Sequence, residues 1–300
     1  MKHREKQTRR RSAFTLIEIM VATAIMIILV GLVIKVTSDI LIVWNRSSGK
    51  LSAAAEARLA LDLITRDLET AVLRNNGKEW LRVESEADGN VGGPYDGQTV
   101  GLNLFAPALD FVSDAQNPGS LCAIAYRLSY QVPYANGVET YILYRSVFSP
   151  EETFDTVLGQ PAQDALTGGP FSVSAVVQDE NFLVGNVIEF KVLLYIDETA
   201  QTGSSTPVPY NADETSLELD PGFIAYSSAT SYPNPDAQIT SDTPILYADV
   251  TLQVISDEGM RLLQRFDDVG AFGEFDSVDD IVRQHGNIFT RRVNFFVQPI

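Results

Sequence analysis

At 300 residues, with 45% hydrophobic residues and a mean hydropathy near zero, the chain can build a folded core, which argues against disorder. Its formal charge of −17 repels phosphate backbones, so no nucleic-acid partner is expected. The lone cysteine, Cys122, lies in an apolar run and is predicted to be a buried thiol without an intrachain disulfide partner, while two histidines are too few for a multi-histidine metal site.

The first predicted elements are a basic leader and an apolar helix. Residues 1–13 hold six basic side chains against one acidic side chain, and residues 14–34 form an almost uncharged run. As a helix, 21 residues span about 30 Å, the thickness of a bilayer's hydrocarbon core. The leader is expected to stay in the cytoplasm, with a single pass through the inner membrane and the rest of the chain beyond it. A cleaved secretory signal would have a shorter apolar run and a small-residue site after it.

Glu18 is the one charge in this apolar run, and a carboxylate there is costly unless it has a function. The nearest following cation, Lys35, lies at the far end of the run. Cleavage between Ala13 and Phe14 would create a terminal ammonium four residues before Glu18, on the same helix or on that of a neighbour. We therefore interpret Glu18 as the partner of a charge that processing creates.

The segment "A-FTLIE" before an apolar helix resembles the processing signal of type IV pilins and pseudopilins. The resemblance implies that prepilin peptidase cuts between Ala13 and Phe14 and methylates the new amino terminus of Phe14. It also implies that Glu18 neutralises the terminal amine of an adjacent subunit during fibre assembly on an inner-membrane platform. Ala13 departs from the glycine that usually precedes the cut in this family, and alanine is likewise a small residue.

Residues 35–74 are predicted to continue the helix as an amphipathic half. Leu59, Leu63, Ile64 and Leu68 recur at steps of three and four residues, and the charged side chains between them are expected to face solvent. A weak point is expected around Gly49, and the helix is predicted to stop at residues 75–77, "NNG".

Residues 75–300 are predicted to form a β-rich head, which gives an α+β fold with an antiparallel sheet packed on the long helix. Aromatic and β-branched runs separated by turn residues indicate strands. They are residues 100–105, 109–113, 124–130, 140–147, 188–196, 245–255 and 291–298, with a short helix at 256–266. Residues 198–243 are rich in Ser, Thr, Pro, Asn and Asp, and are expected to be a loop insertion with little regular structure.

The segment "ALDLITRDLETAV" and the order of helix and strands resemble J-type minor pseudopilins, and the chain also resembles a prepilin-like cassette family described from the Verrucomicrobia. The first resemblance implies a subunit of a periplasmic fibre, in a type II secretion system. A minor pilin of a type IV pilus and a membrane-anchored binding module that never joins a fibre remain alternatives.

No catalytic constellation is recognisable, so the chain is expected not to be an enzyme and to need no cofactor. Its serines lack the Gly-x-Ser-x-Gly turn, and its glycine clusters lack the lysine of a phosphate loop. Acidic residues near the C-terminus could bind calcium as an alternative to a solvated acidic loop. They are Asp267, Asp268, Glu274, Asp276, Asp279 and Asp280, and their spacing is not that of an EF-hand, so no metal site is assigned.

Overall fold

The computed structural model describes residues 15–72, 79–85, 91–95, 97, 99–108, 121–133, 138–158, 166, 169–196, 208–209, 222–226, 238–239, 245–273 and 275–295. The chain forms two compact units, Met1–Ser48 and Gly49–Ile300. The boundary falls within the segment around Gly49 that the sequence marks as a weak point of the helix.

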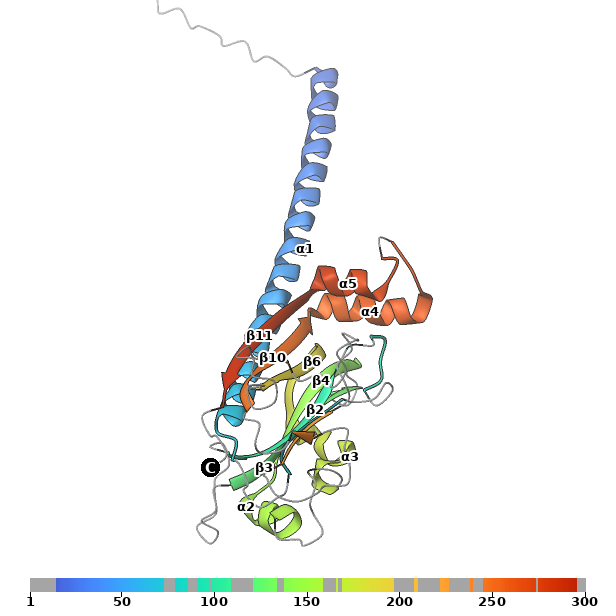
Figure 1. Cartoon of the computed structure of the whole chain (residues 1–300). Helices are drawn as coiled ribbons and strands as arrows, with labels where there is room; N and C mark the ends of the chain where they lie inside the picture. Colours follow the sequence, from blue (N-terminus) through green and yellow to red (C-terminus); the bar gives the residue numbers. More distant parts are fainter. Residues whose placement is uncertain are drawn as a thin grey trace, which may run out of the picture. The chain divides into compact units, whose positions relative to one another are not determined.

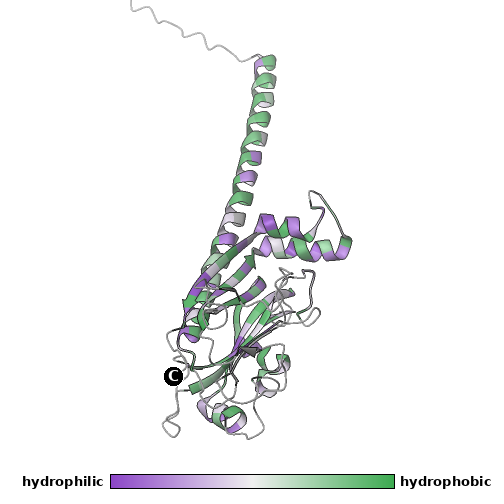
Figure 2. Cartoon of the chain, viewed as in Figure 1, coloured by the Kyte–Doolittle hydropathy of each residue, from purple (hydrophilic) through white to green (hydrophobic). Residues whose placement is uncertain are grey.

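Helix α1, Leu16–Glu69, is 54 residues long and confirms the predicted apolar N-terminal helix. Its first part, up to Trp44, buries none of its large apolar side chains, which are between 47% and 77% exposed. Figure 2 shows this part as mostly hydrophobic. Side chains that are apolar on every face of a helix require lipid or other helices around them.

The helix ends five residues before the predicted position. The hydroxyl of Thr70 donates to the carbonyl of Arg66 at 2.8 Å, and the N–H of Val72 donates to the carbonyl of Phe105 at 2.7 Å. The chain therefore leaves α1 because Val72 bonds to the neighbouring strand, a contact that the local sequence does not reveal. The predicted stop at residues 75–77 lies outside the described residues.

Two sheets form the head, and the described residues place seven strands in the first. Its strand order is β5-β4-β3-β2-β1-β8-β9, antiparallel except for the β8–β9 pair. The strands are β1 (Glu79–Ser85), β2 (Val100–Pro107), β3 (Leu121–Gln131), β4 (Thr140–Val147), β5 (Phe182–Gly185), β8 (Gly222–Tyr226) and β9 (Gln238–Ile239).

The second sheet has four strands within the same described ranges, in the antiparallel order β11-β10-β6-β7. They are β6 (Val187–Ile196), β7 (Val208–Pro209), β10 (Ile245–Ile255) and β11 (Gly286–Asn294). Helices α4 (Asp257–Val269) and α5 (Val278–His285) form a hairpin between β10 and β11 (Figure 1). The fold is thus α+β, as predicted.

The 198–243 insertion contains more regular structure than expected, because β7, β8 and β9 all fall within it. β8 pairs with β1 and β9 pairs with β8, so the first sheet gains two strands from the insertion, and the second sheet gains β7, which pairs with β6. These strands are short and lie among Ser, Thr and Pro residues, so the composition of the whole segment conceals them. The other residues of the insertion, and the predicted strand 109–113, lie outside the described residues.

The C-terminal part of α1 packs on the first sheet and supplies the main core. Ala57, Ile64 and Leu68 are fully buried in one cluster with Leu102 and Leu104 of β2. Of the predicted apolar stripe, Ile64 and Leu68 lie in this core, whereas Leu59 is 70% exposed and Ala57, Ala60 and Leu61 take part in its place.

Short helical segments on the 148–181 stretch supply a second, smaller core cluster. They are α2 (Pro150–Glu152), η1 (Thr153–Leu158), η2 (Gly169–Phe171), α3 (Val173–Val176) and η3 (Asp179–Asn181). Val157, Phe171 and Val176 pack there with Phe105 and Tyr144 of the sheet. Because neighbouring side chains on a strand point to opposite faces, these segments cover the face opposite α1. Cys122 is 1% exposed, as predicted for a buried thiol.

Candidate functional site

The start of α1 is a reciprocal hydrogen-bonded cap between Thr15 and Glu18. The Thr15 N–H donates to Glu18 Oε2 at 2.9 Å, and the Thr15 hydroxyl approaches the same oxygen at 3.0 Å. The Glu18 N–H lies 3.3 Å from Thr15 Oγ1. This is a capping box, in which the residue before the helix and the third helical residue satisfy each other's backbone groups.

This capping box uses one of the two oxygens of the Glu18 carboxylate. Both bonds go to Oε2, and among the described residues Thr15 is the one partner of the Glu18 side chain. The second oxygen, Oε1, keeps its capacity to accept hydrogen bonds from a donor outside the chain. The T-x-x-E spacing of residues 15–18 is the signal in the sequence that could have revealed this cap.

The predicted cleavage residues, Ala13 and Phe14, lie outside the described residues. Glu18 itself sits in the first turn of α1, between Ile17 and Ile19, which are 69% and 56% exposed. Glu18 therefore sits on a helix surface that is otherwise hydrophobic. In lipid or in a packed bundle, a carboxylate in this position needs a cation or donors beside it.

Comparison with known families finds the prokaryotic N-terminal methylation motif at residues 8–34. The matched stretch contains the arginines of the leader, the Ala13–Phe14 junction, Glu18 and the apolar run. It supports a pilin-type chain that prepilin peptidase processes and that assembles with other pilins. No curated protein and no solved structure matches the chain.

The described residues contain one helix long and apolar enough to cross a membrane, which is α1. Length and composition fit the single membrane anchor of pilin-like proteins. The methylation motif lies at the N-terminal end of this same helix.

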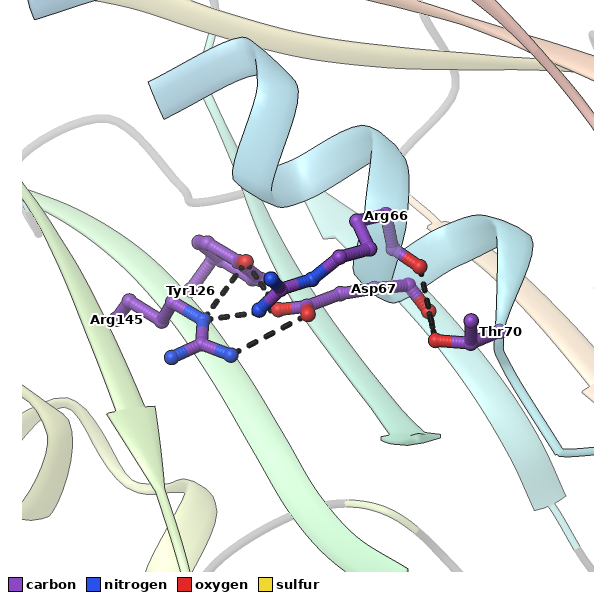
Figure 3. Close-up of polar contacts among 5 residues, drawn as sticks. All are labelled: Arg66, Asp67, Thr70, Tyr126 and Arg145. Atoms are coloured by element: carbon purple, nitrogen blue, oxygen red, sulfur yellow. Dashed lines mark hydrogen bonds and ion pairs between the residues drawn. The ribbon is translucent and has the colours of Figure 1, made fainter. Parts of the chain in front are cut away.

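A second polar site is buried where α1 meets the first sheet (Figure 3). Asp67 of α1 is 1% exposed, and Tyr126 of β3 and Arg145 of β4 are also buried. Arg145 Nε donates to Asp67 Oδ2 at 2.8 Å, and Arg145 Nη2 donates to Oδ1 at 3.2 Å. The Tyr126 hydroxyl donates to Asp67 Oδ2 at 2.5 Å. The carboxylate is thus held by a two-pronged guanidinium and a phenol.

This buried cluster joins α1 to the strands β3 and β4 by hydrogen bonds. Burial, and then the charge of Asp67, raise the pKa of Tyr126 well above its ordinary range, so the phenol stays protonated. Arg66, next to Asp67, directs its guanidinium toward the same cluster (Figure 3). Asp67, Tyr126 and Arg145 are each at most 8% exposed, so their contacts hold α1 against β3 and β4 inside the core.

Asp67 is one of the charged side chains of residues 35–74 that were expected to face solvent, and this expectation is wrong, because Asp67 is 1% exposed. Asp67 lies three residues after Ile64 and next to Leu68, both fully buried, so it falls on the apolar stripe of α1. The helical spacing was therefore a signal available in the sequence. Its partners Tyr126 and Arg145 could not be found that way, because strand pairing brings them together from distant positions.

The acidic residues considered for calcium are spread over the α4–α5 hairpin. Asp267 and Asp268 belong to α4, Asp276 precedes α5, Asp279 and Asp280 belong to α5, and Glu274 lies outside the described residues. Asp280 accepts hydrogen bonds from the N–H and hydroxyl of Ser277 as part of a helix cap. Within the described ranges, no three Asp, Glu, His or Cys side chains form a group that could hold a metal ion.

Proposed function

We propose that the chain is a structural subunit of a pilin-like fibre. Prepilin peptidase removes residues 1–13 by cutting between Ala13 and Phe14, and the new N-terminus at Phe14 is methylated. The subunit is held in the inner membrane by α1 with its head in the periplasm, and it joins other pilin-like subunits at an inner-membrane assembly platform. The methylation motif at residues 8–34 supports this role over an enzymatic one.

The environment of Glu18 is the observation that carries the proposal. Its carboxylate lies on an exposed apolar helix, and among the described residues only Oε2 accepts hydrogen bonds, both from Thr15. The ammonium of Phe14 exists only after cleavage, and an ammonium is a strong donor to a carboxylate. A neighbouring subunit's Phe14 ammonium, placed against Oε1, would satisfy both charges when the helices leave lipid and pack together.

The J-like segment that contains Arg66 and Asp67 supports a minor pseudopilin of a type II secretion system. A minor pilin of a type IV pilus is the nearest alternative with the same processing. The acidic head disfavours a pilus that contacts DNA, since a DNA-binding tip should be basic.

Fibre incorporation of a Glu18→Gln variant tests the proposal, with Asp39→Asn as the matched control. Both changes remove one negative charge from the exposed first part of α1. We expect Glu18→Gln to insert in the membrane and be cleaved, but to be lost from the sheared fibre fraction and from crosslinks with other subunits. Asp39→Asn should incorporate as the wild type does.

Equal incorporation of Glu18→Gln and the wild type would contradict the fibre role and favour the anchored binding module. Loss of both variants from the fibre would show a general effect of charge on α1, and the specific role of Glu18 would fail. To separate secretion from a pilus, the secreted proteins and the surface fibres are measured in cells that lack this chain.

A further inference from the structure

The head contains a cavity of about 360 Å³ that the assembly role of α1 leaves unused. It lies between α4, the end of β5, the segment before β4 and the turn of α1 that carries Glu56. All of these elements belong to the unit Gly49–Ile300. The volume is at the lower end of the range for ligand sites, and it suits one side chain with its adjoining backbone.

The cavity has an excess of negative charge that the head does not neutralise. Glu56, Glu139 and Asp257 come from three separate elements, and Arg261 is the one cation among the described residues that line it. Glu56 is hydrogen-bonded to Ser52, and Asp257 accepts from Asn186. No ion pair within the described residues joins these carboxylates to Arg261. The site therefore favours a positively charged ligand.

The same cavity presents apolar surface beside the carboxylates. Val138 is 64% exposed, and Phe182 is 38% exposed, while Met260 lies buried beneath them. Lysine and arginine side chains combine an aliphatic stem with a charged end, so they match apolar and acidic surface at once. A bare inorganic cation would leave the apolar part unused.

The walls of the cavity are held in place by hydrogen bonds between elements. Asn186 has a positive φ of 59°, and its side chain accepts from the Thr140 hydroxyl at 2.7 Å and donates to Asp257 at 2.7 Å. Gln264 of α4 donates to the carbonyl of Glu139 at 2.5 Å. A site fixed in this way loses little entropy when a ligand enters it.

We propose that this cavity binds a lysine or arginine side chain of a protein partner. A metal ion is disfavoured because, within the described ranges, no three acidic side chains converge on one point. An anionic ligand is disfavoured by the excess of carboxylates. The proposal does not depend on Glu18 or on processing, so its failure would leave the fibre role untouched.

Carbodiimide crosslinking of the full chain in detergent tests where a lysine binds. The probe is the peptide acetyl-Leu-Lys-Leu-amide, whose amine forms an isopeptide bond with a nearby activated carboxylate. We expect mass spectrometry to find the bond on Glu56, Glu139 or Asp257, and excess acetyl-Leu-Arg-Leu-amide to suppress it. Bonds spread evenly over exposed carboxylates such as Glu69 and Glu258 would overturn the proposal.

Calorimetric binding of the same peptide gives an independent measurement. The Glu56→Gln/Glu139→Gln variant should raise the Kd about tenfold, since each exposed ion pair contributes a few-fold. The Glu69→Gln/Glu258→Gln variant makes the same change of charge on α1 and α4 outside the cavity, and it should bind as the wild type does. An unchanged Kd in the first variant, or equal binding of acetyl-Leu-Glu-Leu-amide, would refute the site.

Discussion

Removing the charge of Asp67 should destabilise the head severely, because Arg145 would remain buried without the carboxylate that holds it. In Asp67→Asn, the two bonds from Arg145 and the 2.5 Å bond from Tyr126 lose their charged acceptor. Breaking a buried ion pair from one side costs about 3–5 kcal/mol. A typical domain has only about 5–15 kcal/mol of stability, so the variant should lose a large part of it.

Urea unfolding of the full chain in detergent, followed by tryptophan fluorescence, measures this loss. The chain has two tryptophans, and Trp80 is 5% exposed on β1, whereas Trp44 is exposed on α1. In a Trp44→Phe background, the fluorescence reports on the head alone. We expect the midpoint for Asp67→Asn to fall with an unchanged slope, as for a loss of stability in a two-state transition.

A triple variant separates the electrostatic cause from loss of packing. Asp67→Leu with Arg145→Met and Tyr126→Phe replaces the buried carboxylate, guanidinium and phenol by apolar groups of similar size, and leaves the half-buried Arg66 in place. Apolar replacement of a buried ion pair is often neutral, so this variant should lie within about 2 kcal/mol of the wild type. A loss of less than about 1 kcal/mol in Asp67→Asn, or a triple variant less stable than Asp67→Asn, would show that an unpaired buried Arg145 is not the cause of the destabilisation.

Three further predictions concern the head. Because the pKa of Tyr126 is raised in the folded state, the unfolded state ionises first, and the free energy of unfolding should fall as the pH rises above 10.0. In a pH series of urea melts, Tyr126→Phe should reduce this fall. Ser277→Ala should cost about 1 kcal/mol by loss of the α5 cap. The hydrogen bonds from Ser277 lower the pKa of Asp280, so the difference in the free energy of unfolding between the wild type and Ser277→Ala should shrink as the pH falls below 3.8. A difference that stays constant with pH would contradict this prediction. Gly259→Ala should cost about 1–3 kcal/mol in thermal melts, since its Cβ would come within 2.5 Å of neighbouring side chains, whereas Gly49→Ala, with open space around it, should stabilise by about 0.5–1 kcal/mol.

The long helix and the main strands could be predicted from the sequence because their signals are local. An apolar run without proline predicts the first half of α1, and aromatic, β-branched runs predict β3, β4, β6 and β10. The end of α1 could not be predicted, since a hydrogen bond between Val72 and Phe105 fixes it, and these residues are 33 positions apart.

The candidate site was predictable only in part. Glu18 stands out as the single charge in an apolar run, and Thr15 could have been added from its spacing. Asp67 was recognisable as a charge on an apolar stripe, but its partners depend on the register of β3 with β4, in which Tyr126 lies opposite Arg145. That register is a property of the folded sheet and is not encoded in either strand alone.

The most direct test of the fibre role is the mass of the mature N-terminus, measured by mass spectrometry in cells with and without prepilin peptidase. We predict a chain that begins with a methylated Phe14 when the peptidase is present and an unprocessed chain when it is absent. An intact Met1 in both strains, or a cut beyond the apolar run, would contradict the account and leave Glu18 without its proposed partner.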